Sequence, residues 1–354
     1  MIGSWQLPAL DHRLQLSLQA ALDAKTKPLG SLGRLEELAL RLGLIQGSSR
    51  PQIDRPTLIV FAGDHGLCAE AGVSPYPQAV TQAMVRNFAS GGAAINVLAR
   101  QLGWQLQIVD SGVAEVCPFP EVEDLAIARS TKSCLRTAAM TVPQYHEALS
   151  RGAHLMRKHF DQGTRLLACG DMGIGNSSAA ALILHELLGM PLETVISRGA
   201  GCDDLQLTKK LHILEKVVAQ HGTLSDPELV LQHYAGFEMV MAVGAMLEAA
   251  RLRVPVLVDG LILSSAVYAA IKVQPRLADF LIFAHRSSAT GHDALLADLG
   301  VTPLLDLGMR LGEGTGAALA LPIVQSAVAI LNEMATFASA DVPTAHEMTD
   351  AVLL

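Results

Sequence analysis

The stretch ACGDMGIGNSSAAALIL, residues 168–184, carries residue types that can hold an anion. An apolar run before it, 166–169, is typical of a buried strand, and the run 177–188 has helical length and propensity. The turn between them contains three glycines and three polar side chains: Gly170, Gly173, Gly175, Asn176, Ser177 and Ser178. Such glycines let backbone N–H groups converge, and the unpaired amides of a first helical turn favour a phosphate. An ordinary serine-capped turn is the alternative. The turn lacks both G-K-[ST] and G-x-G-x-x-G, so the phosphorylated ligand stays open.

Glu313 is a candidate general base, since it lies between two glycines in LLDLGMRLGEGTGAAL, residues 304–319, directly before a predicted helix. A carboxylate on such a turn, beside apolar residues, is placed to be partly desolvated, and desolvation raises its pKa toward that of a working base. Alternatively, Glu313 is a first-turn acid that only complements the helix dipole. Residue chemistry alone favours neither interpretation.

Three further loops contain groups that could bind a ligand. The loop GVSPYPQAVTQ, residues 72–82, has Ser74 and Gln82 as hydrogen-bonding groups for a flat heterocycle and Tyr76 to pack on it; otherwise it is simply a rigid loop. SRGAGCDD, 197–204, precedes a helix with two lysines and could contact a second phosphate or a ribose; otherwise it is a surface turn. HRSSATGHD, 285–293, is rich in small polar residues.

Asp64 and His65 follow the first predicted strand and raise the question of a metal site. No H-x-x-x-H or H-E-x-x-H pairing supplies further ligands. A structural histidine is therefore the favoured interpretation, with metal a minority one.

The composition restricts the class of protein. Half of the 354 residues are hydrophobic, which suits a large core, and five scattered cysteines indicate neither a disulfide framework nor a zinc site, so a reducing cytoplasm fits best. The N-terminus lacks a secretory signal, and Asp259 and Pro322 interrupt the two most apolar stretches, so we expect no membrane span. A formal net charge of −8 without a basic stripe argues against nucleic acid and favours small-molecule ligands.

Five apolar runs separated by helical patterns predict the architecture: 57–63, 104–112, 165–171, 254–260 and 279–285. Runs without polar alternation suit strands buried on both faces, with parallel right-handed crossovers between them. The predicted fold is an α/β doubly wound, mostly parallel sheet. Polar residues follow these strands: Asp64, His65, Asp110, Ser111, Asp171, Asp259 and His285. Ligands bind at the carboxyl ends of such strands, so we expect one shared site there.

Both chain ends are predicted to be helical and without strands. Leucines follow helical spacing from Ser31, and residues 315–338 form a long apolar helix with a kink or break near Pro322. These ends predict a small helical lobe or a surface for a second subunit.

Taken together, these segments resemble one family, the nicotinate-nucleotide:dimethylbenzimidazole phosphoribosyltransferases of cobalamin lower-ligand synthesis. The resemblance runs almost end to end, in order, through TKPLGSLGRLEELA, AGDHG, GVSPYPQAVTQAMV, GGAAINVLAR, GDMGIGNSS, GAGCDD, VDGLILSSA and LGEGTGAALALP. It implies a homodimer with a large Rossmann-like domain, 51–314, and a small helical domain formed from both chain ends, 1–50 plus 315–354.

The resemblance also implies the reaction and the roles of residues. Nicotinate mononucleotide and 5,6-dimethylbenzimidazole would give α-ribazole 5′-phosphate and nicotinate, without a metal or another cofactor. Glu313 takes the position of the family's general base, with Asp171 assisting. The benzimidazole substrate would contact Ser74, Tyr76 and Gln82. The residues that would hold the nucleotide are Gly173, Gly175, Asn176, Ser177, Gly199, Gly201, Lys210, Ser287 and Arg310.

This chain departs from the family pattern at two places. Asp171 stands where the family usually has Glu, and Ala289 and Thr290 stand where it tends to have E-P. These changes could alter which base is preferred. Three alternatives stay open: transfer to a purine or phenolic base, a non-catalytic nucleotide-binding protein of the same fold, and a metal hydrolase using Asp64, His65 and Asp171.

Overall fold

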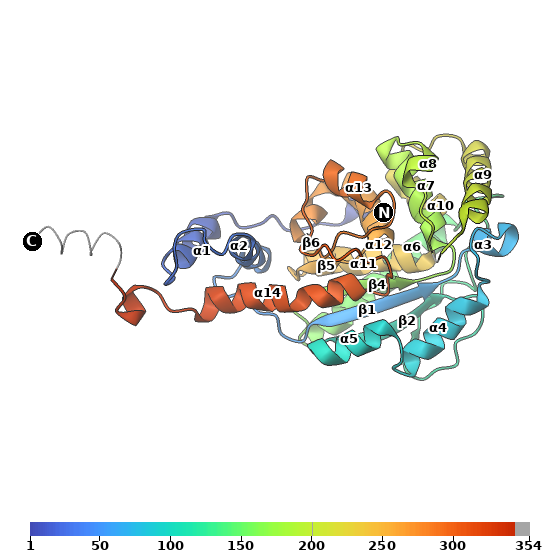
Figure 1. Cartoon of the computed structure of the whole chain (residues 1–354). Helices are drawn as coiled ribbons and strands as arrows, with labels where there is room; N and C mark the ends of the chain where they lie inside the picture. The colour runs from blue at the N-terminus through green and yellow to red at the C-terminus, as the bar shows by residue number, and fades with distance from the viewer. Residues whose placement is uncertain (200, 344–354) are drawn as a thin grey trace, which may run out of the picture. The chain divides into compact units, whose positions relative to one another are not determined.

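The computed structural model describes residues 1–199 and 201–343, and its centre is a six-stranded parallel sheet (Figure 1). The strand order is β3-β2-β1-β4-β5-β6, and every neighbouring pair is parallel. The strands are β1 (Thr57–Gly63), β2 (Gln105–Gly112), β3 (Val122–Asp124), β4 (Leu167–Met172), β5 (Val256–Val258) and β6 (Leu281–Phe283). This is the doubly wound order, so the predicted fold class is confirmed.

The central strand shows why its sequence has no polar alternation. All seven residues of β1 are buried, and Leu58 is paired with Leu106 of β2 on one side and Ala168 of β4 on the other. A strand covered on both faces and both edges has no solvent-facing side onto which polar residues could alternate. All five predicted strands are present. The sixth, β3, was not predicted, because it has three residues of which only Val122 is buried.

Helices cover both faces of the sheet. In Figure 1, α4 and α5 lie on one face, and α11 and α12 lie on the other. The helices are α1 (Arg13–Asp23), α2 (Arg34–Gln46), α3 (Gly66–Ala71), α4 (Ala79–Ala89), α5 (Ala94–Leu102), α6 (Val142–Asp161), α7 (Asn176–Leu188), α8 (Leu192–Val195), α9 (Asp204–His221), α10 (Pro227–Tyr234), α11 (Phe237–Arg251), α12 (Leu261–Val273), α13 (His292–Asp298) and α14 (Thr315–Glu333), with short 3₁₀ turns at Ile2–Ser4, Pro275–Phe280 and Ala338–Ala340.

Helix α11 is the core helix of the large unit. Its residues 237–250 are all buried, and it packs closely on α6 because both helices have glycine at the crossing. A Cβ at Gly152 would overlap the Met241 carbonyl, and one at Gly244 would overlap the Leu149 carbonyl. This tight packing fixes the first turn of α11, which carries the buried Glu238, next to Gly63 at the end of β1.

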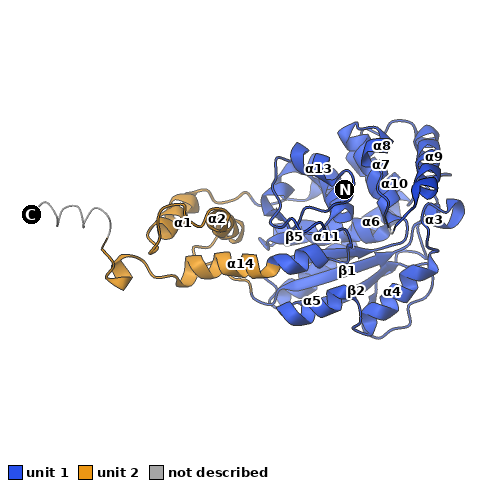
Figure 2. Cartoon of the chain, in the orientation of Figure 1, with its two compact units in different colours: residues 1–8, 54–320 blue, residues 9–53, 321–354 orange. Residues whose placement is uncertain are grey.

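The chain forms two compact units, coloured separately in Figure 2. Unit 1 comprises residues 1–8 and 54–320, and unit 2 comprises 9–53 and 321–354, of which the structure describes the part up to 343. Within unit 2, α1 packs on α2 where Gly43 meets Leu18, and the buried Lys27 Nζ lies 2.9 Å from Glu36 Oε1. The predicted domain division, 1–50 plus 315–354 against 51–314, stays a proposal, and its residues 344–354 lie outside the described part.

Helix α14 matches the predicted C-terminal apolar helix but ends at Glu333 rather than near 338. It continues through Pro322, so there is no break at that residue. Among the described residues it is the one helix long and apolar enough to cross a membrane, with a mean hydropathy of 1.5 over an 18-residue window that is 56% buried. Core helices pass the same test, so this is weak evidence for a membrane span.

Candidate functional site

The site is built where the strand order reverses, between β1 and β4. The two strands are neighbours, but their following helices lead to opposite directions of the sheet, and doubly wound sheets bind ligands at the carboxyl ends of the strands at such a point. The segment after β1 carries Asp64 and His65, and the segment after β4 carries the glycine turn 173–175. Both segments thus follow the carboxyl ends of neighbouring strands, and the single shared site for the strand-end polar residues stays a prediction.

The glycine turn after β4 leads into α7 with Gly175 as its N-cap residue, at φ +105°. Only at Gly175 does the turn need a positive φ. Gly170 and Gly173 are required for a different reason than we predicted, namely close approach: a Cβ would overlap the carbonyl oxygens of Glu313 and Gly63, respectively. The turn is therefore a rigid support for the first turn of α7, with the Asn176 and Ser178 N–H groups donating to the carbonyls of Gly173 and Gly175.

Lys210 joins the two predicted nucleotide loops. Its side chain is buried, and Nζ donates to Ser177 Oγ and to the Ser197 carbonyl oxygen, both at 2.9 Å. Burial lowers the pKa of Lys210 to about 8. The segment at Gly199 lies against Ser177, and Arg310 Nη1 donates to the Gly199 carbonyl at 3.5 Å. A cation thus stands at the first turn of α7, where a phosphate binds best.

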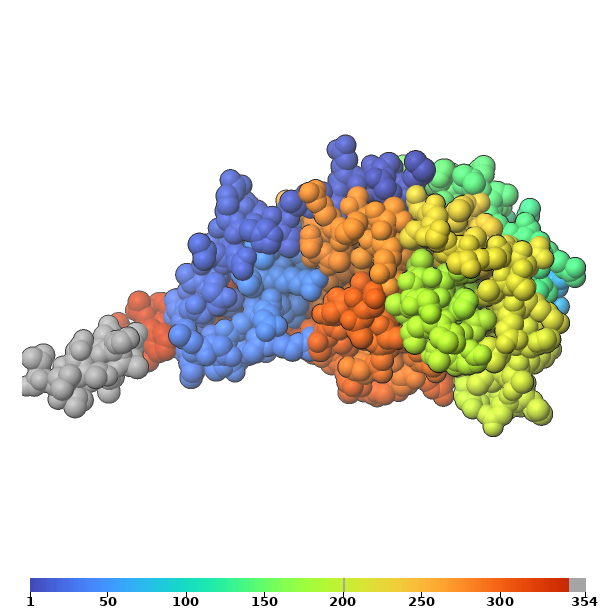
Figure 3. All heavy atoms as spheres, turned by 90° about the horizontal axis from the view of Figure 1, so that it is seen from above, coloured from blue at the N-terminus to red at the C-terminus, as the bar shows by residue number. Residues whose placement is uncertain are grey.

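Ser287 is held in place by a buried histidine. The Ser287 N–H donates to His292 Nδ1 at 2.9 Å, so Nε2 carries the ring proton toward Ser264 Oγ, 3.0 Å away. Burial lowers the pKa of His292 to about 4, which keeps the ring neutral and able to accept. Gly201, predicted to contact the nucleotide, is exposed. Its N–H donates to the Arg198 carbonyl of its own turn. Figure 3 shows the face on which α7–α9, green to yellow, adjoin the orange segments around α13.

Glu313 is buried and has a strained backbone. Its φ is +62°, in the left-handed region that non-glycine residues rarely adopt. Burial raises the pKa of its carboxyl, opposed by the Ile95 backbone N–H at the start of α5 and reinforced by Asp259. Its Oε2 has no hydrogen-bond partner. The expected desolvation is therefore present, and one oxygen of the carboxylate is left to accept a proton.

Asp259 anchors the backbone turn that carries Glu313. Its carboxylate is fully buried and accepts from the N–H groups of Gly314 at 3.2 Å and Ala317 at 2.9 Å, the first turn of α14. His285 lies under the same turn, with Nε2 3.7 Å from Asp259 Oδ1 and a Nδ1 that has no partner. Two strand-end residues thus fix the loop that presents the candidate base.

Asp171 lies beside the candidate base but makes a contact of its own. Its Oδ2 accepts from Asn176 Nδ2 at 2.8 Å, so the Asn176 amide, predicted to face the nucleotide, is engaged by a protein carboxyl. Burial first, and then the charges of Asp259, Glu238 and Glu313, raise the pKa of Asp171 well above its ordinary value. Two neighbouring carboxyl groups at this edge therefore resist ionising together.

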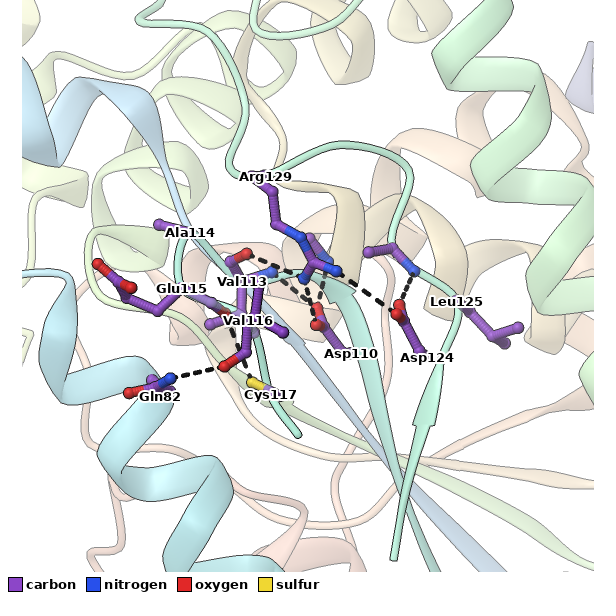
Figure 4. Close-up of polar contacts among 12 residues, drawn as sticks. Gln82, Asp110, Val113, Ala114, Glu115, Val116, Cys117, Asp124, Leu125 and Arg129 are labelled. Atoms are coloured by element: carbon purple, nitrogen blue, oxygen red, sulfur yellow. Dashed lines mark hydrogen bonds and ion pairs between the residues drawn. The ribbon is translucent and has the colours of Figure 1, made fainter. Parts of the chain in front are cut away.

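The predicted base-binding side chains lie on the loop before α4 and on α4 itself. Ser74 Oγ accepts from the Tyr76 N–H at 3.2 Å, and Tyr76 is 48% exposed. Gln82 Nε2 donates to the Val116 carbonyl at 2.6 Å (Figure 4). Because a carbonyl can only accept, this bond fixes which end of the Gln82 amide is Nε2 and leaves Oε1 as an acceptor.

Asp64 and His65 are occupied by protein partners. His65 Nε2 lies 2.8 Å from Glu238 Oε1, and both side chains are buried. Burial opposes the charged ring, but Glu238 raises the pKa of His65 overall. Asp64 accepts from Thr81 Oγ1 at 2.6 Å and from the Ala114 N–H at 2.9 Å, and burial raises its pKa to about 6. These bonds support the structural interpretation over a metal site.

Sequence reasoning missed Glu238. It lies at the start of α11, and its Oε2 has no partner although glycines at 63 and 236 surround the carboxylate. A single acid at the start of the apolar run GFEMVMAVGAM was the available signal. Among residues 1–199 and 201–343, no three His, Cys, Asp or Glu side chains are grouped as for a metal ion.

Known proteins match the chain along nearly its whole length. A family model described as DBI_PRT, phosphoribosyltransferase, matches residues 7–342. The nicotinate-nucleotide–dimethylbenzimidazole phosphoribosyltransferase of Cupriavidus taiwanensis is 49% identical over 341 residues, which cover 96% of this chain and 98% of that protein. The enzyme of the same name from Ralstonia nicotianae is 49% identical over 339 residues, which cover 95% of this chain and 96% of that protein. The crystal structure of the Thermus thermophilus enzyme of the same name has a TM-score of 0.87 at 38% identity, covering 95% of this chain and 100% of that one. The chain therefore belongs to the DBI_PRT family of phosphoribosyltransferases.

Proposed function

We propose that this phosphoribosyltransferase moves the phosphoribosyl group of nicotinate mononucleotide to 5,6-dimethylbenzimidazole, giving α-ribazole 5′-phosphate and nicotinate, with Glu313 as general base. The names of the relatives support the substrates. The observation that supports the role of Glu313 is its buried carboxylate, whose Oε2 has no partner. Its backbone is bonded to Asp171, next to the glycine turn at the carboxyl end of β4.

The chemistry needs a base more than an acid. Nicotinate leaves from a pyridinium whose nitrogen is already cationic, so the C1–N bond breaks and its electron pair returns to that nitrogen without a proton. One benzimidazole nitrogen forms the new bond to C1 from the opposite face, which converts the β-nucleotide into an α-riboside. The other nitrogen loses its proton to Glu313, a step that contributes about 10²- to 10⁴-fold.

The nucleotide phosphate is proposed to bind at the first turn of α7. The helix dipole favours a dianion there, and the buried ammonium of Lys210 is 2.9 Å from Ser177 Oγ in that turn. Gly199, Arg310 and Ser287 complete the nucleotide side in this proposal, together with Gly173, Gly175 and Asn176. Gly201 is the weakest member because its described contacts stay within its own turn.

The acceptor base is proposed to lie between Glu313 and the segment that carries Ser74, Tyr76 and Gln82. The Oε1 of Gln82 is an acceptor for an N–H or O–H group. Asp171 is proposed to assist: burial and the neighbouring carboxylates raise its pKa, so a protonated Asp171 would add no second negative charge beside Glu313. Because Asp171, Ala289 and Thr290 depart from the family pattern, the preference among acceptor bases is the property to measure.

We also propose a homodimer located in the cytoplasm, which the family resemblance supports. Sedimentation equilibrium of the purified chain tests the assembly: a mass of twice 37.4 kDa is expected, and a monomer at micromolar concentration contradicts it. Fractionation of cells tests the location, with the protein expected in the cytoplasmic fraction.

The reaction is tested by incubating the purified protein with nicotinate mononucleotide and, separately, dimethylbenzimidazole, adenine and a phenol, with products identified by chromatography and mass. Nicotinate release coupled to α-ribazole phosphate is expected. Transfer only to adenine or to the phenol would replace the acceptor. No coupled product from a folded protein that binds the mononucleotide would indicate a binding role instead.

A further inference from the structure

Asp64, in the segment after β1, and Thr81, on α4, link these two segments to two others through their side chains. The Thr81 hydroxyl donates to Asp64 Oδ1 at 2.6 Å and accepts from the Ile174 N–H at 3.2 Å, because an N–H can only donate. The second Asp64 oxygen accepts from the Ala114 N–H at 2.9 Å. Thr81 is fully buried, and Asp64 is 1% exposed. The glycine turn after β4, helix α4 and the segment after β2 therefore share one hydrogen-bond network.

The segment after β2 reaches the base side of the site from this network. Within 113–117, the Val116 carbonyl holds Gln82 Nε2 at 2.6 Å, and Gln82 follows Thr81 on α4. Asp110 holds the other end: its Oδ1 accepts from the Val113 N–H at 2.8 Å and its Oδ2 from Arg129 Nη1 at 2.7 Å (Figure 4). Gln82 is thus fixed from two sides, through Thr81 on its own helix and through Val116.

We propose that Thr81 and Asp64 are positioning residues that set the spacing between the turn that holds the mononucleotide phosphate and Gln82 on the base side. The inference rests on the proposed function for which substrate lies on which side. Neither residue touches the reacting atoms in this proposal. Ile174 lies between Gly173 and Gly175, so a shift of its N–H moves the turn, and a shift of Thr81 moves Gln82.

The decisive variant is Thr81→Val, which keeps the volume and branching but removes the hydroxyl. It leaves Asp64 Oδ1 and the Ile174 N–H without their partner in a buried place, so both segments are released at once. Displacements of about 1 Å can reduce turnover by up to about 10²-fold. We expect kcat to fall about tenfold or more and KM to rise for both substrates. Thr81→Ser, which restores the hydroxyl, should recover most of the activity.

Arg129→Gln is the matched one-sided variant. It removes the ion pair that anchors 113–117 but leaves the bonds of Thr81 to Asp64 and Ile174 in place. We expect it to raise KM for the base severalfold and to change KM for the mononucleotide less than twofold. An equal rise of both values in this variant would contradict the division into two sides.

The experiment measures kcat and both KM values at 25 °C for wild type and the three variants, with thermal melts to show that each is folded at that temperature. A merely structural role lowers the melting temperature of Thr81→Val without changing kcat or either KM, and this result would overturn the proposal. Absence of product from wild type would instead refute the proposed function. Calorimetric titration of Thr81→Val with nicotinate mononucleotide tests the turn separately, with weaker binding than wild type expected and equal binding contradicting the link to Ile174.

Discussion

The backbone N–H of Glu313 donates a hydrogen bond to the carbonyl oxygen of Asp171, with 3.3 Å between nitrogen and oxygen. Because Gly170 allows the Glu313 backbone to pack directly on β4, two acidic side chains from distant parts of the chain leave the same edge of the sheet. Their order along that edge is fixed by main-chain geometry. Side-chain substitutions at either position leave this backbone hydrogen bond available.

Glu313→Gln should separate chemistry from binding. The amide keeps the shape of the side chain but cannot take a proton, so we expect kcat to fall about 10²- to 10⁴-fold, with the affinity for the mononucleotide nearly unchanged. Steady-state kinetics and calorimetric titration measure the two effects. Glu333→Gln, on an exposed side chain at the end of α14, is the matched control and should behave as wild type. Near-normal turnover of Glu313→Gln would show that another group is the base.

The stability of the same variant should depend on pH in a known direction. The pKa of Glu313 is raised above its ordinary value of 4.5 in the folded protein, so its ionised form is disfavoured there. Above the folded pKa, Glu313→Gln should have a larger free energy of unfolding than wild type. This advantage should shrink as pH falls through the folded pKa and vanish below about 4.5. Urea titrations from pH 4 to 8 measure it, and a difference that is constant with pH would contradict the burial of the charge.

Lys210 should make mononucleotide binding sensitive to alkaline pH. Its lowered pKa of about 8 means that the ammonium loses its proton as pH rises through that value. The phosphate stays a dianion above pH 7, since its second pKa is near 6. We expect the Kd to rise between pH 7 and 9 in wild type and to be weak and flat over the same range in Lys210→Met. A flat Kd in wild type would show that this ammonium does not contact the phosphate.

Gly175→Ala tests the turn before α7. A Cβ there would lie 3.1 Å from Cys68 Cβ and 3.2 Å from His65 Cβ, on a backbone at φ +105°. We expect lower stability and mononucleotide affinity at least tenfold weaker. Gly163→Ala provides the comparison, because its φ of +101° gives similar backbone strain but nothing lies within 4 Å. Gly163→Ala should lose about 1 kcal/mol of stability and no affinity; equal affinities for the two variants would remove the phosphate turn from the proposal.

The buried pair of His65 and Glu238 should be strongly coupled. Removing one partner leaves the other without compensation, which costs about 3 to 5 kcal/mol in buried pairs. The raised pKa of His65 stabilises the fold fully below the unfolded value of 6.5, and this stabilisation is lost as pH rises through the folded pKa. A double-mutant cycle with His65→Ala and Glu238→Ala should therefore give a larger coupling energy at pH 6 than at pH 9. The exposed pair of His212 and Glu215 should give about 0 to 1 kcal/mol.

The strands could be predicted because burial on both faces leaves long apolar runs, and the candidate base because glycines flank an acid before a helix. Other features depend on contacts between distant segments. Glu238 of α11 contacts His65, and Thr81 of α4 contacts Ile174, each across a long stretch of sequence. Gly170 and Gly173 were predicted to let backbone N–H groups converge but are needed for close packing, and local sequence does not distinguish the two needs.

The left-handed backbone of Glu313 has a consequence for protein engineering. At φ +62°, glycine or asparagine fits with less strain than glutamate, and either would also remove a poorly solvated charge. A library selected for thermostability alone should therefore enrich both substitutions at position 313 and yield thermostable but inactive variants. Selection schemes for this fold need a turnover screen in every round, because thermostability and catalysis favour different residues at this position.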